Sequence, residues 1–433
     1  MRRLMLMLIP LLLVIIPAAA QEDDDEDGLA ASPATYTTTA HSLTGNRVVP
    51  GSGAFPDVQQ NDIELPAIPA WVLGAPVGNE PVWIVVDVNG AVYGTYVGAE
   101  GAYVRTDALN DSLPPGMPPI MATDAFGSFI DFNLPENLAA YTHPSRVTER
   151  TAYITEAGRL ALVDGAGSVL NLLDVNAASD LRVVINTVGQ AAAYVESTDQ
   201  RYVHGIMGDR LEHAAMVVLD LGTGAVTALV ELPGTMVFEG LSPFWADVDG
   251  DGSADLVTTV ADDGIGAQVR VYTAQGTLLA TGPAIGQSNR WRHQLAWASF
   301  GPQGENLLAE VLTPHIGGVV GFFAYDGAGE LVRVARAEGF SSHPINSRNL
   351  DMAVAGDFDG DGQVELVVPN QQRDEISGLA LAPDYTVIER WQLPLDGQLM
   401  TNLSAVTLPD GGLALAAGVQ GYDGVARLRL WRP

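Results

Sequence analysis

The sequence predicts an all-β protein in which short antiparallel sheets stand in a ring, the architecture called a β-propeller. The first observation is a recurring unit of two apolar runs joined by a turn that contains Gly or Asp, which is typical of a β-hairpin. The second is its period of roughly 50–70 residues, which matches one four-stranded blade with its loops. The third is that no long amphipathic helix is visible. A single period over most of the chain favours the ring over a pair of β-sandwiches.

The hairpins and the shorter apolar segments before them define the expected blades. The hairpins cover 82–97, 151–163, 215–232, 268–281, 321–335 and 379–393. We expect inner strands to start near 53, 128, 182, 244, 295, 352 and 403. This gives seven blades, and the degenerate first and third units leave six as the alternative. The last unit stops one strand short, so we expect the N-terminal segment 36–49 to supply its outer strand and to close the ring.

The N-terminus is typical of an exported protein. Residues 1–20 combine a basic tip, a short apolar stretch and an Ala-rich exit, which predicts a cleavable secretory signal peptide. A membrane anchor is the alternative, but the apolar stretch is interrupted by Pro10 and is shorter than the roughly 20 residues that span a bilayer. Residues 21–39 are expected to form an acidic flexible linker, and residues 40–433 the propeller domain.

The composition limits the partners of the chain. The formal net charge is −31, every basic residue is arginine, and there is no cysteine. Disulfides are therefore excluded, and the acidic surface makes nucleic acid and anionic lipid poor partners. We expect no membrane span in the mature chain. The acidic run 21–27 is interpreted as a solvated spacer rather than as a cation-binding segment.

Two acidic turns occupy matching positions of two units. "ADVDGDGSADLV" (246–257) and "GDFDGDGQVELVV" (356–368) each place aspartates at alternate positions around two glycines. Alternate side chains of a tight loop point to one centre, and the carboxylate oxygens gathered there suit calcium, which takes six to eight oxygen ligands. The alternative is a metal-free turn. An EF-hand is excluded because its twelfth position is Thr258 or Val368 and both flanks are predicted strands.

Both stretches resemble the calcium loop of FG-GAP (VCBS-like) repeats in integrin-α-type β-propellers, which joins the first and second strands of a blade. The resemblance is sharp over 243–282 and 352–397. It implies a seven-bladed propeller with structural calcium, in which Ser253 and Gln363 contribute backbone carbonyls. The implied ligands are Asp247, Asp249, Asp251, Ser253 and Asp255, and Asp357, Asp359, Asp361, Gln363 and Glu365.

Other stretches depart from this loop pattern. The segments 299–308 and 407–415 have the corresponding place without the acids, so no ion is expected there. The segment 57–65 keeps Asp57, Asn61 and Glu64 and is interpreted as an eroded third site.

Histidine and arginine are predicted to gather at the end of the ring opposite the acidic turns. Most of them fall in segments interpreted as connections between second and third strands or between blades. Such a rim would suit an anionic or sugar ligand, with Arg donating paired hydrogen bonds and Trp stacking. The alternative is that polar loops simply collect these residues. The candidate ligand-binding residues are Arg290, Trp291, Arg292, His293, His315, His343 and Arg373.

No catalytic motif is visible, so the preferred function is a non-enzymatic, exported binding or adhesion module for a glycan or protein ligand. A carbohydrate-active lyase or hydrolase that uses the His/Arg-rich end is the first alternative, with Asp262, Asp263 and Asp374 as its acids. A structural envelope protein is the second.

Overall fold

The computed structural model describes residues 34–37, 43–77, 80–97, 103–105, 112–118, 120–123, 137–147 and 150–433. These residues form strands, turns and connections without a helix, so the all-β prediction is confirmed. Within them no helix is long and apolar enough to cross a lipid bilayer. The predicted signal peptide and the acidic linker, except for the backbone of 34–37, lie outside the described residues.

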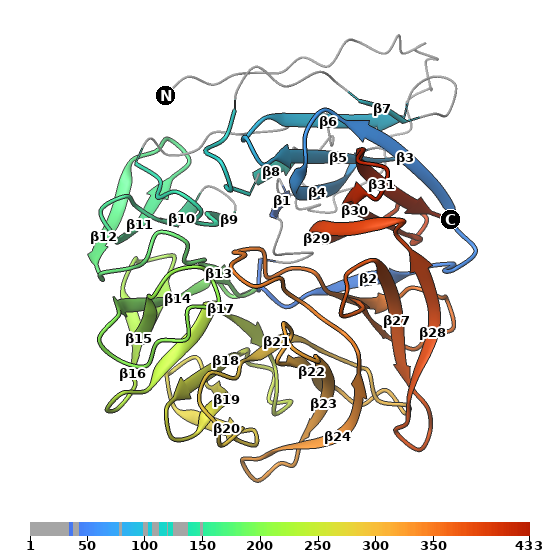
Figure 1. Cartoon of the computed structure of the whole chain (residues 1–433). Helices are drawn as coiled ribbons and strands as arrows, with labels where there is room; N and C mark the ends of the chain where they lie inside the picture. Colours follow the sequence, from blue (N-terminus) through green and yellow to red (C-terminus); the bar gives the residue numbers. More distant parts are fainter. Residues whose placement is uncertain are drawn as a thin grey trace, which may run out of the picture.

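Antiparallel sheets surround a common centre (Figure 1). There are four separate four-stranded sheets, an eight-stranded sheet made of two such groups joined by the pair His213–Phe238, and a five-stranded sheet made of one group plus β2. The described residues thus contain seven four-stranded groups, in agreement with the larger predicted number. The number of blades in the whole chain stays a prediction.

The strands of each group are given from the inner to the outer strand. The first two groups are β4 (Pro69–Val77), β5 (Glu80–Asp87), β6 (Val92–Val97), β7 (Tyr103–Arg105), and β9 (Ser145–Val147), β10 (Arg150–Ile154), β11 (Arg159–Asp164), β12 (Val169–Asp174). The next two are β13 (Val184–Ile185), β14 (Gln190–Thr198), β15 (Glu212–Asp220), β16 (Val226–Glu231), and β17 (Val237–Ala246), β18 (Asp255–Asp262), β19 (Gly266–Tyr272), β20 (Leu278–Thr281).

The remaining groups continue around the ring. They are β21 (Arg292–Ala298), β22 (Leu307–Leu312), β23 (Val319–Tyr325), β24 (Leu331–Glu338), then β25 (Val354–Asp357), β26 (Glu365–Pro369), β27 (Glu375–Leu381), β28 (Val387–Pro394), and last β29 (Gly397–Thr407), β30 (Leu413–Gly421), β31 (Ala426–Arg432), β3 (Gln59–Leu65). Outside these groups, β1 (Ala34–Thr37) pairs with β8 (Ile120–Thr123), and β2 (Val48–Ser52) pairs in parallel with β25.

The ring is closed by an N-terminal strand, but not by the predicted segment. The outer strand of the last group is β3, which pairs with β31 from Gln59–Arg432 to Leu65–Ala426. Of the predicted segment 36–49, Val48 and Val49 belong to β2, and Val49 is buried in the same apolar cluster as Phe358. The segment 59–65 suits the outer position because its polar residues alternate with less exposed ones, as expected of a half-solvated strand.

The predicted inner-strand starts agree with the structure for the later groups only. β13, β21 and β25 begin within three residues of the expected positions, and β17 and β29 begin seven and six residues before them. The first group begins at Pro69 rather than near 53, because 59–65 belongs to the closing strand. The second begins at Ser145 rather than near 128, a position outside the described residues.

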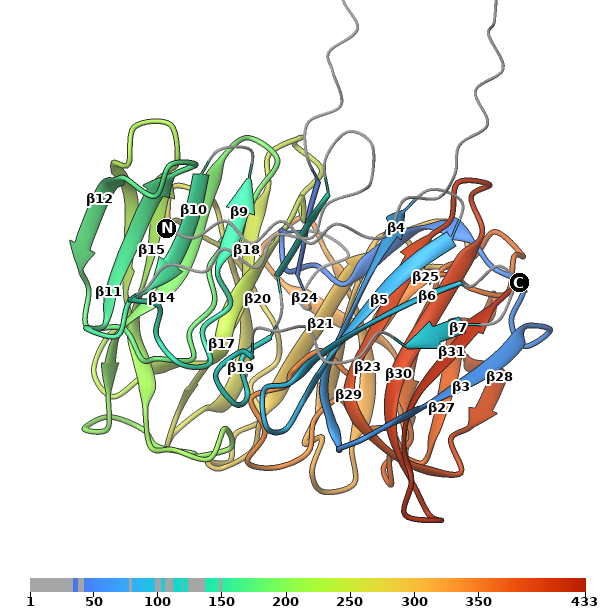
Figure 2. The same ribbon diagram turned by 90° about the horizontal axis from the view of Figure 1, so that it is seen from above.

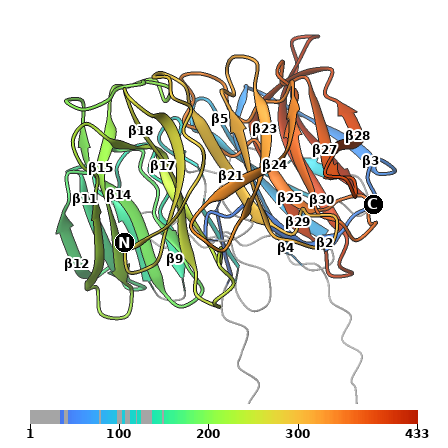
Figure 3. The same cartoon turned by 90° about the horizontal axis from the view of Figure 1, so that it is seen from below.

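A shared irregularity marks the groups as copies of one unit. In five of them the register between the third and fourth strands shifts within the pair, as in Leu162/Val163 and Phe322/Phe323. Such β-bulges increase the local twist of a strand pair, and their recurrence at one place indicates a common geometry. Figures 2 and 3 show the strands running through the thickness of the ring, with the connections at its two ends.

Apolar side chains fill the space between neighbouring sheets. The described residues contain several buried apolar clusters, the largest of which spans the groups from β9–β12 to β17–β20. Glycine makes room for tryptophan in two groups: a Cβ on Gly74 would lie 2.3 Å from the Trp83 ring, and one on Gly378 equally close to Trp391. Any larger residue at either glycine would displace the indole and cost packing energy.

Candidate metal centres and a buried histidine cluster

The first acidic turn connects the inner strand β17 to β18 and is folded around its own backbone amides. Asp247 accepts hydrogen bonds from the amides of Gly250 (2.8 Å) and Gly252 (3.1 Å). Carboxylate oxygens of Asp247, Asp249 and Asp255 lie within 4.8 Å of one another. Asp255 is 4 % exposed, whereas the other two lie nearer the surface. The turn therefore presents three carboxylates to a single point.

The second acidic turn connects β25 to β26 and gathers four carboxylates. Oxygens of Asp357, Asp359, Asp361 and Glu365 lie within 4.8 Å of one another. Glu365 is fully buried; its Oε2 accepts the amide of Phe358 at 2.6 Å, and its Oε1 has no hydrogen-bond partner. A buried carboxylate oxygen without a partner is costly unless a cation or a proton meets it.

Glycines give both turns the same backbone. Gly250 and Gly252 have φ angles of 76° and 87°, and Gly360 and Gly362 have 79° and 88°. These left-handed conformations are open to glycine and strained for other residues. The two turns are therefore copies of one loop, as the sequence predicted, and each joins the first and second strands of its sheet.

Burial dominates the electrostatics of the innermost acid in each turn. Burial raises the pKa of Asp255 to about 7, although the hydrogen bond from the Val248 amide opposes this. Burial likewise raises the pKa of Glu365 to about 9, and the negative charges of Asp359 and Asp357 add to the effect. The protein without a cation thus resists ionisation of these two groups, and a cation would reverse that preference.

The two turns differ in their neighbours. In the second turn Arg390 lies 2.5 Å from Asp361, and the Ser52 hydroxyl donates to Asp357 at 2.8 Å. The backbone of Gly53 also donates to the Asp357 carbonyl at 2.7 Å, so the N-terminal segment is fastened to this turn. No such contacts are present at the first turn among the described residues.

Most, but not all, of the acids predicted as metal ligands belong to the two carboxylate groups. Asp251 does not belong to the carboxylate group of the first turn. The side-chain amide of Gln363 donates to the Leu381 carbonyl at 2.8 Å, and the Ser253 amide donates to Asp251. The carbonyl ligands predicted for Ser253 and Gln363 stay predictions. Hard carboxylate oxygens in this arrangement fit calcium better than softer metals that prefer nitrogen or sulfur.

The eroded third site is not a turn. Asn61 and Glu64 lie in β3, the closing strand, and Asp57 lies just before it. Asp62, in the same strand, accepts two hydrogen bonds from Arg429 at 2.7 Å each. Residues 59–65 pair with β31 along their length, so they form a strand rather than the loop that the eroded pattern would need.

The predicted histidine and arginine rim is largely buried. Trp291, His293 and His343 are at most 2 % exposed, and His315 packs against His343 with ring centroids 4.9 Å apart. Trp291 stacks on His293 at 4.6 Å. These four rings form one cluster, which we call the histidine cluster, at the end of the ring opposite the acidic turns. Their ligand-binding role stays a prediction, and in this structure Trp291, His293 and His343 are buried.

The three arginines predicted for the rim have separate surroundings. Arg292 points away from the histidine cluster and forms a buried ion pair with Glu310. Arg290 donates to the backbone carbonyl of Asn289 and is partly exposed. Arg373 is half-buried, and its charge lowers the pKa of His315 and His343 in addition to the larger effect of burial. Arg373 is thus the one predicted arginine that lies at the histidine cluster.

The histidines of the cluster are held neutral. Burial lowers the pKa of His343 to about 3 and that of His315 to about 4. The Nε2 atom of His343 lies against the Ser347 carbonyl, and the Nδ1 atom of His315 lies 3.2 Å from the His343 carbonyl. Because a carbonyl accepts a hydrogen bond, these contacts assign the imidazole protons to those atoms.

Sequence reasoning missed a group of buried charged residues, Arg47, Arg182 and Asp351. Arg47 and Arg182 both bind Asp351, at 3.1 Å and 2.7 Å, and all three are buried. Nearby, His204 Nδ1 lies 2.6 Å from the buried Glu239. A signal was available for the arginines, since Arg47 and Arg182 each precede a pair of valines that enter a strand. An arginine there must point either to solvent or to a buried acid.

Two of the three acids proposed for an enzyme, Asp262 and Asp374, have local roles. Asp262 accepts the amides of Gly264 and Ile265, both at 2.7 Å, within its own turn. Asp374 bonds to Asn370 at 2.8 Å and to Tyr422 at 3.0 Å. These contacts account for the two carboxylates without a substrate.

Comparisons with known proteins bear on the fold. No protein-family model matches the chain, and no curated protein matches it. Among solved structures it is similar to the quinohemoprotein alcohol dehydrogenase of Comamonas testosteroni, with TM-score 0.56 and 11% identity over 92% of this chain and 80% of that one. It is also similar to a europium-containing methanol dehydrogenase, with TM-score 0.57 and 10% identity over 92% and 98% of the two chains.

A third match is the quinohemoprotein alcohol dehydrogenase ADHIIG of Pseudomonas putida HK5, with TM-score 0.54 and 11% identity over 92% of this chain and 79% of that one. At such low identity the likeness concerns the fold alone. Together with the ring of four-stranded sheets, it establishes that the chain is a β-propeller protein.

Proposed function

We propose that the chain is an exported β-propeller, stabilised by calcium, that acts as a non-enzymatic binding or adhesion module. The calcium part rests on one observation, the fully buried Glu365 whose Oε1 has no partner while three aspartates face the same point. A divalent cation would supply the missing partner and balance the charge. The resemblance of both turns to FG-GAP repeats supports the same assignment.

The role of calcium in this proposal is structural. In a chain without cysteine, an ion that binds only the folded state adds stability by mass action. The second turn also holds the N-terminal segment through Ser52 and Gly53, which precede the closing strand β3. Calcium there would hold together two segments that are distant in the sequence.

The binding part of the proposal rests on the end of the ring opposite the acidic turns. Exposed apolar side chains from several connections occur at that end, whereas the exposed apolar residues Val169, Val226, Leu278 and Val332 lie at the beginning of outer strands. A contiguous patch of such groups would mark a surface that meets a partner. The residues at the opposite end are Ile68, Val88, Leu211, Ile316, Ile345 and Tyr422.

Terbium luminescence and calcium titration calorimetry test the metal. We expect two classes of site, of which Glu365→Gln removes one and Asp249→Asn weakens the other. Asp410→Asn is the matched control, because Asp410 lies in the corresponding turn between β29 and β30 and caps only its own turn. Absence of calcium binding, or equal binding by all three variants, contradicts the metal assignment.

A glycan array and a protein-capture screen, each with and without calcium, test the binding function. We expect a ligand whose binding is reduced at least about tenfold by Ile316→Asp with Ile345→Asp, since a charge at an apolar contact is costly. Val188→Asp at the acidic end is the control. Turnover of a bound glycan would instead favour the enzyme.

A further inference from the structure

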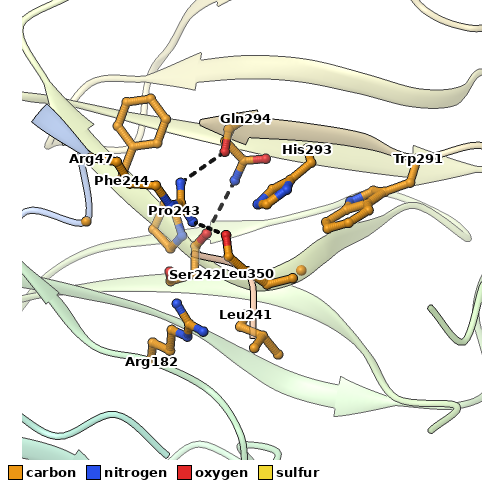
Figure 4. A pocket seen from close by; sticks show the side chains of 12 residues that line it. Arg47, Arg182, Leu241, Ser242, Pro243, Phe244, Trp291, His293, Gln294 and Leu350 are labelled. Carbon is orange, nitrogen blue, oxygen red and sulfur yellow. Dashed lines mark hydrogen bonds between the residues drawn. The ribbon is translucent and has the colours of Figure 1, made fainter. Parts of the chain in front are cut away.

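The connection 199–211, which joins β14 to β15, packs against the interior of the ring beside the histidine cluster. Its middle residues Ile206 and Met207 are buried. They belong to one apolar cluster with Trp291 and Leu350, which Figure 4 shows at the wall of a small interior cavity. The connection therefore helps to keep Trp291 away from solvent.

Two buried carboxyl groups meet this connection at a single residue, His204. Glu239, in the inner strand β17, is 0 % exposed, and its Oε1 lies 2.6 Å from His204 Nδ1. Glu212, the first residue of β15, is 4 % exposed and accepts a hydrogen bond from the His204 amide at 3.4 Å. One carboxyl group thus contacts the imidazole, and the other contacts the backbone of the same residue.

The two sides of His204 in the connection are fastened separately. On one side Arg201 donates to the carbonyls of Leu232 (2.8 Å) and Met236 (3.0 Å). On the other side Asp209 forms an ion pair with Arg348 at 3.1 Å. The segment between these two contacts, residues 202–208, includes glycines with positive φ angles at 205 and 208. Such a segment can change its course while both of its ends stay in place.

The pair of carboxyl groups has no cation of its own. Among the described residues neither Glu212 nor Glu239 forms an ion pair with an arginine, and Glu239 Oε2 is buried without a hydrogen-bond partner. Burial raises the pKa of both groups well above the usual value, and the charge of Glu239 adds to the effect on Glu212. Burial, and after it the charge of Arg290, lowers the pKa of His204 to about 4. The closed arrangement therefore favours a protonated carboxyl group facing a neutral imidazole.

The other charged and titratable groups around the pair do not supply the missing positive charge. Burial lowers the pKa of His213 and of His315 to about 4, so both imidazoles are neutral at neutral pH. Burial, and after it the charge of Glu239, raises the pKa of Tyr202. The whole set is Tyr202 and Asp209 in the connection, His213 in β15, Asp263 after β18, Arg290 before β21 and His315 between β22 and β23.

We propose that the segment 202–208 is a cover that closes over Trp291 only while Glu212 and Glu239 hold a proton between them. When this proton leaves, two negative charges lie in one buried place without a cation, and their repulsion opposes closure. The segment then moves away from the interior between its two fastened ends, and Met207 and Trp291 become accessible. The cover needs neither calcium nor a partner, so it goes beyond the proposed function.

The direction of the response follows from the raised pKa of the carboxyl groups. A group that binds its proton more tightly in the closed form than in the open, solvated form stabilises the closed form at low pH. This stabilisation is lost as the pH rises towards the pKa of the closed form, by up to about tenfold in the closing equilibrium per pH unit for each proton released. The cover therefore opens on the alkaline side.

Oxidation of methionine by hydrogen peroxide measures the opening. Met207 is 6 % exposed and lies in the cover, whereas Met216 is 0 % exposed in β15 and reports unfolding of the sheet. Mass spectrometry follows both sulfoxides in saturating calcium, which keeps the acidic turns occupied. We expect the oxidation rate of Met207 to rise at least about tenfold between about pH 6 and pH 9, while Met216 stays protected.

Three variants assign the effect. Glu239→Gln keeps the shape of the side chain without its charge and should leave Met207 protected at every pH. Glu212→Gln should do the same and serves as a second test if the first variant does not fold. Asp263→Asn is the matched control, because it removes an exposed negative charge near Tyr202 but outside the pair, and it should show the native rise.

Three results would overturn the proposal. The first is a Met207 rate in the native protein that does not change with pH. The second is a rise in both glutamine variants equal to the native rise. The third is parallel oxidation of Met207 and Met216, which would show unfolding of the sheet rather than movement of a cover.

Discussion

The two ends of this propeller differ in whether the charges of their side chains balance one another. At one end, each acidic turn brings three or four carboxylates to a point with few positive groups beside them. At the other, Arg47, Arg182, Asp351, His293 and His343 are buried together, with ion pairs and neutral imidazoles. The first arrangement is unbalanced without an added cation, whereas the second balances most of its charge internally. Charge that is not balanced within a fold points to something bound there.

The two acidic turns show the same contrast on a smaller scale. The second turn has a fourth carboxylate in its group, a side chain of Arg390 beside it and the N-terminal segment fastened to it. The first turn has three carboxylates and none of these contacts among the described residues. Arg390 therefore balances part of the negative charge of the second turn. The contact with Ser52 links the same turn to the segment that precedes the closing strand β3.

Acidification has the largest expected effect, because it acts on the buried histidines. His343 has a pKa of about 3 in the folded protein against 6.5 in an unfolded chain. The unfolded chain therefore binds more protons below pH 6.5, and stability falls as the pH falls from 6.5 towards 3, by on the order of 4 kcal/mol for this residue alone. Urea unfolding as a function of pH, in saturating calcium, measures the loss.

The control for acidification is His343→Asn, which keeps a donor for the Ser347 carbonyl and does not titrate. Its stability should fall less steeply between pH 6.5 and 4.5. Equal slopes for the variant and the native protein would contradict the assignment of the effect to the histidine cluster.

Chelation should have the next largest effect and should act on the acidic end only. Removal of calcium with EDTA is expected to lower Tm by about 5 °C and to be reversed by added calcium, because an ion that binds only the folded state contributes stability. Hydrogen exchange should increase first at β3 and β31, which the second turn supports through Ser52. An unchanged Tm would contradict the metal proposal.

Equivalent substitutions sharpen the comparison of the two turns. Asp361→Asn should reduce calcium affinity at the second turn at least about tenfold, since Asp361 belongs to the carboxylate group. Asp251→Asn should reduce affinity at the first turn by only about threefold, since Asp251 lies outside the group in the ion-free geometry. Equal losses in calorimetric titration would mean that Asp251 turns inward when the ion binds.

The smallest effect is expected from Arg390. Arg390→Gln removes a partly exposed positive charge from Asp361 and should raise calcium affinity at the second turn by about threefold, in line with the modest energies of exposed ion pairs. Arg336→Gln, at an exposed ion pair with Glu338, is the control. A fall in affinity for Arg390→Gln would show that the arginine positions Asp361 for the ion.

The acidic turns and the later sheets were predictable from the sequence because their signals are local. Alternating aspartates with two glycines fix a turn, and apolar hairpins fix strand pairs. The closing strand was not, because β3 consists largely of polar residues and pairs with β31 more than 360 residues away. Its position depends on ring closure rather than on its own composition.

The histidine cluster was only half predictable. The residues are close together, as the sequence suggested, but "NRWRHQ" (289–294) was interpreted as a connection although Arg292 already begins β21. The polar residues Arg292, His293 and Gln294 at the start of this inner strand are buried. A pattern of polar residues therefore indicates solvent in some parts of the propeller and a hydrogen-bonded interior in others.

The pairing of β3 with β31 also determines when the ring can be completed during folding. The segment 59–65 is synthesised early but can form its strand pairing only after residues 426–432 have emerged. The same holds during any passage across a membrane as an extended polypeptide. Until then one sheet has an open edge, which is a surface that aggregates or that a chaperone can protect. The same delay would keep the chain in a translocation-competent form until its final strand arrives.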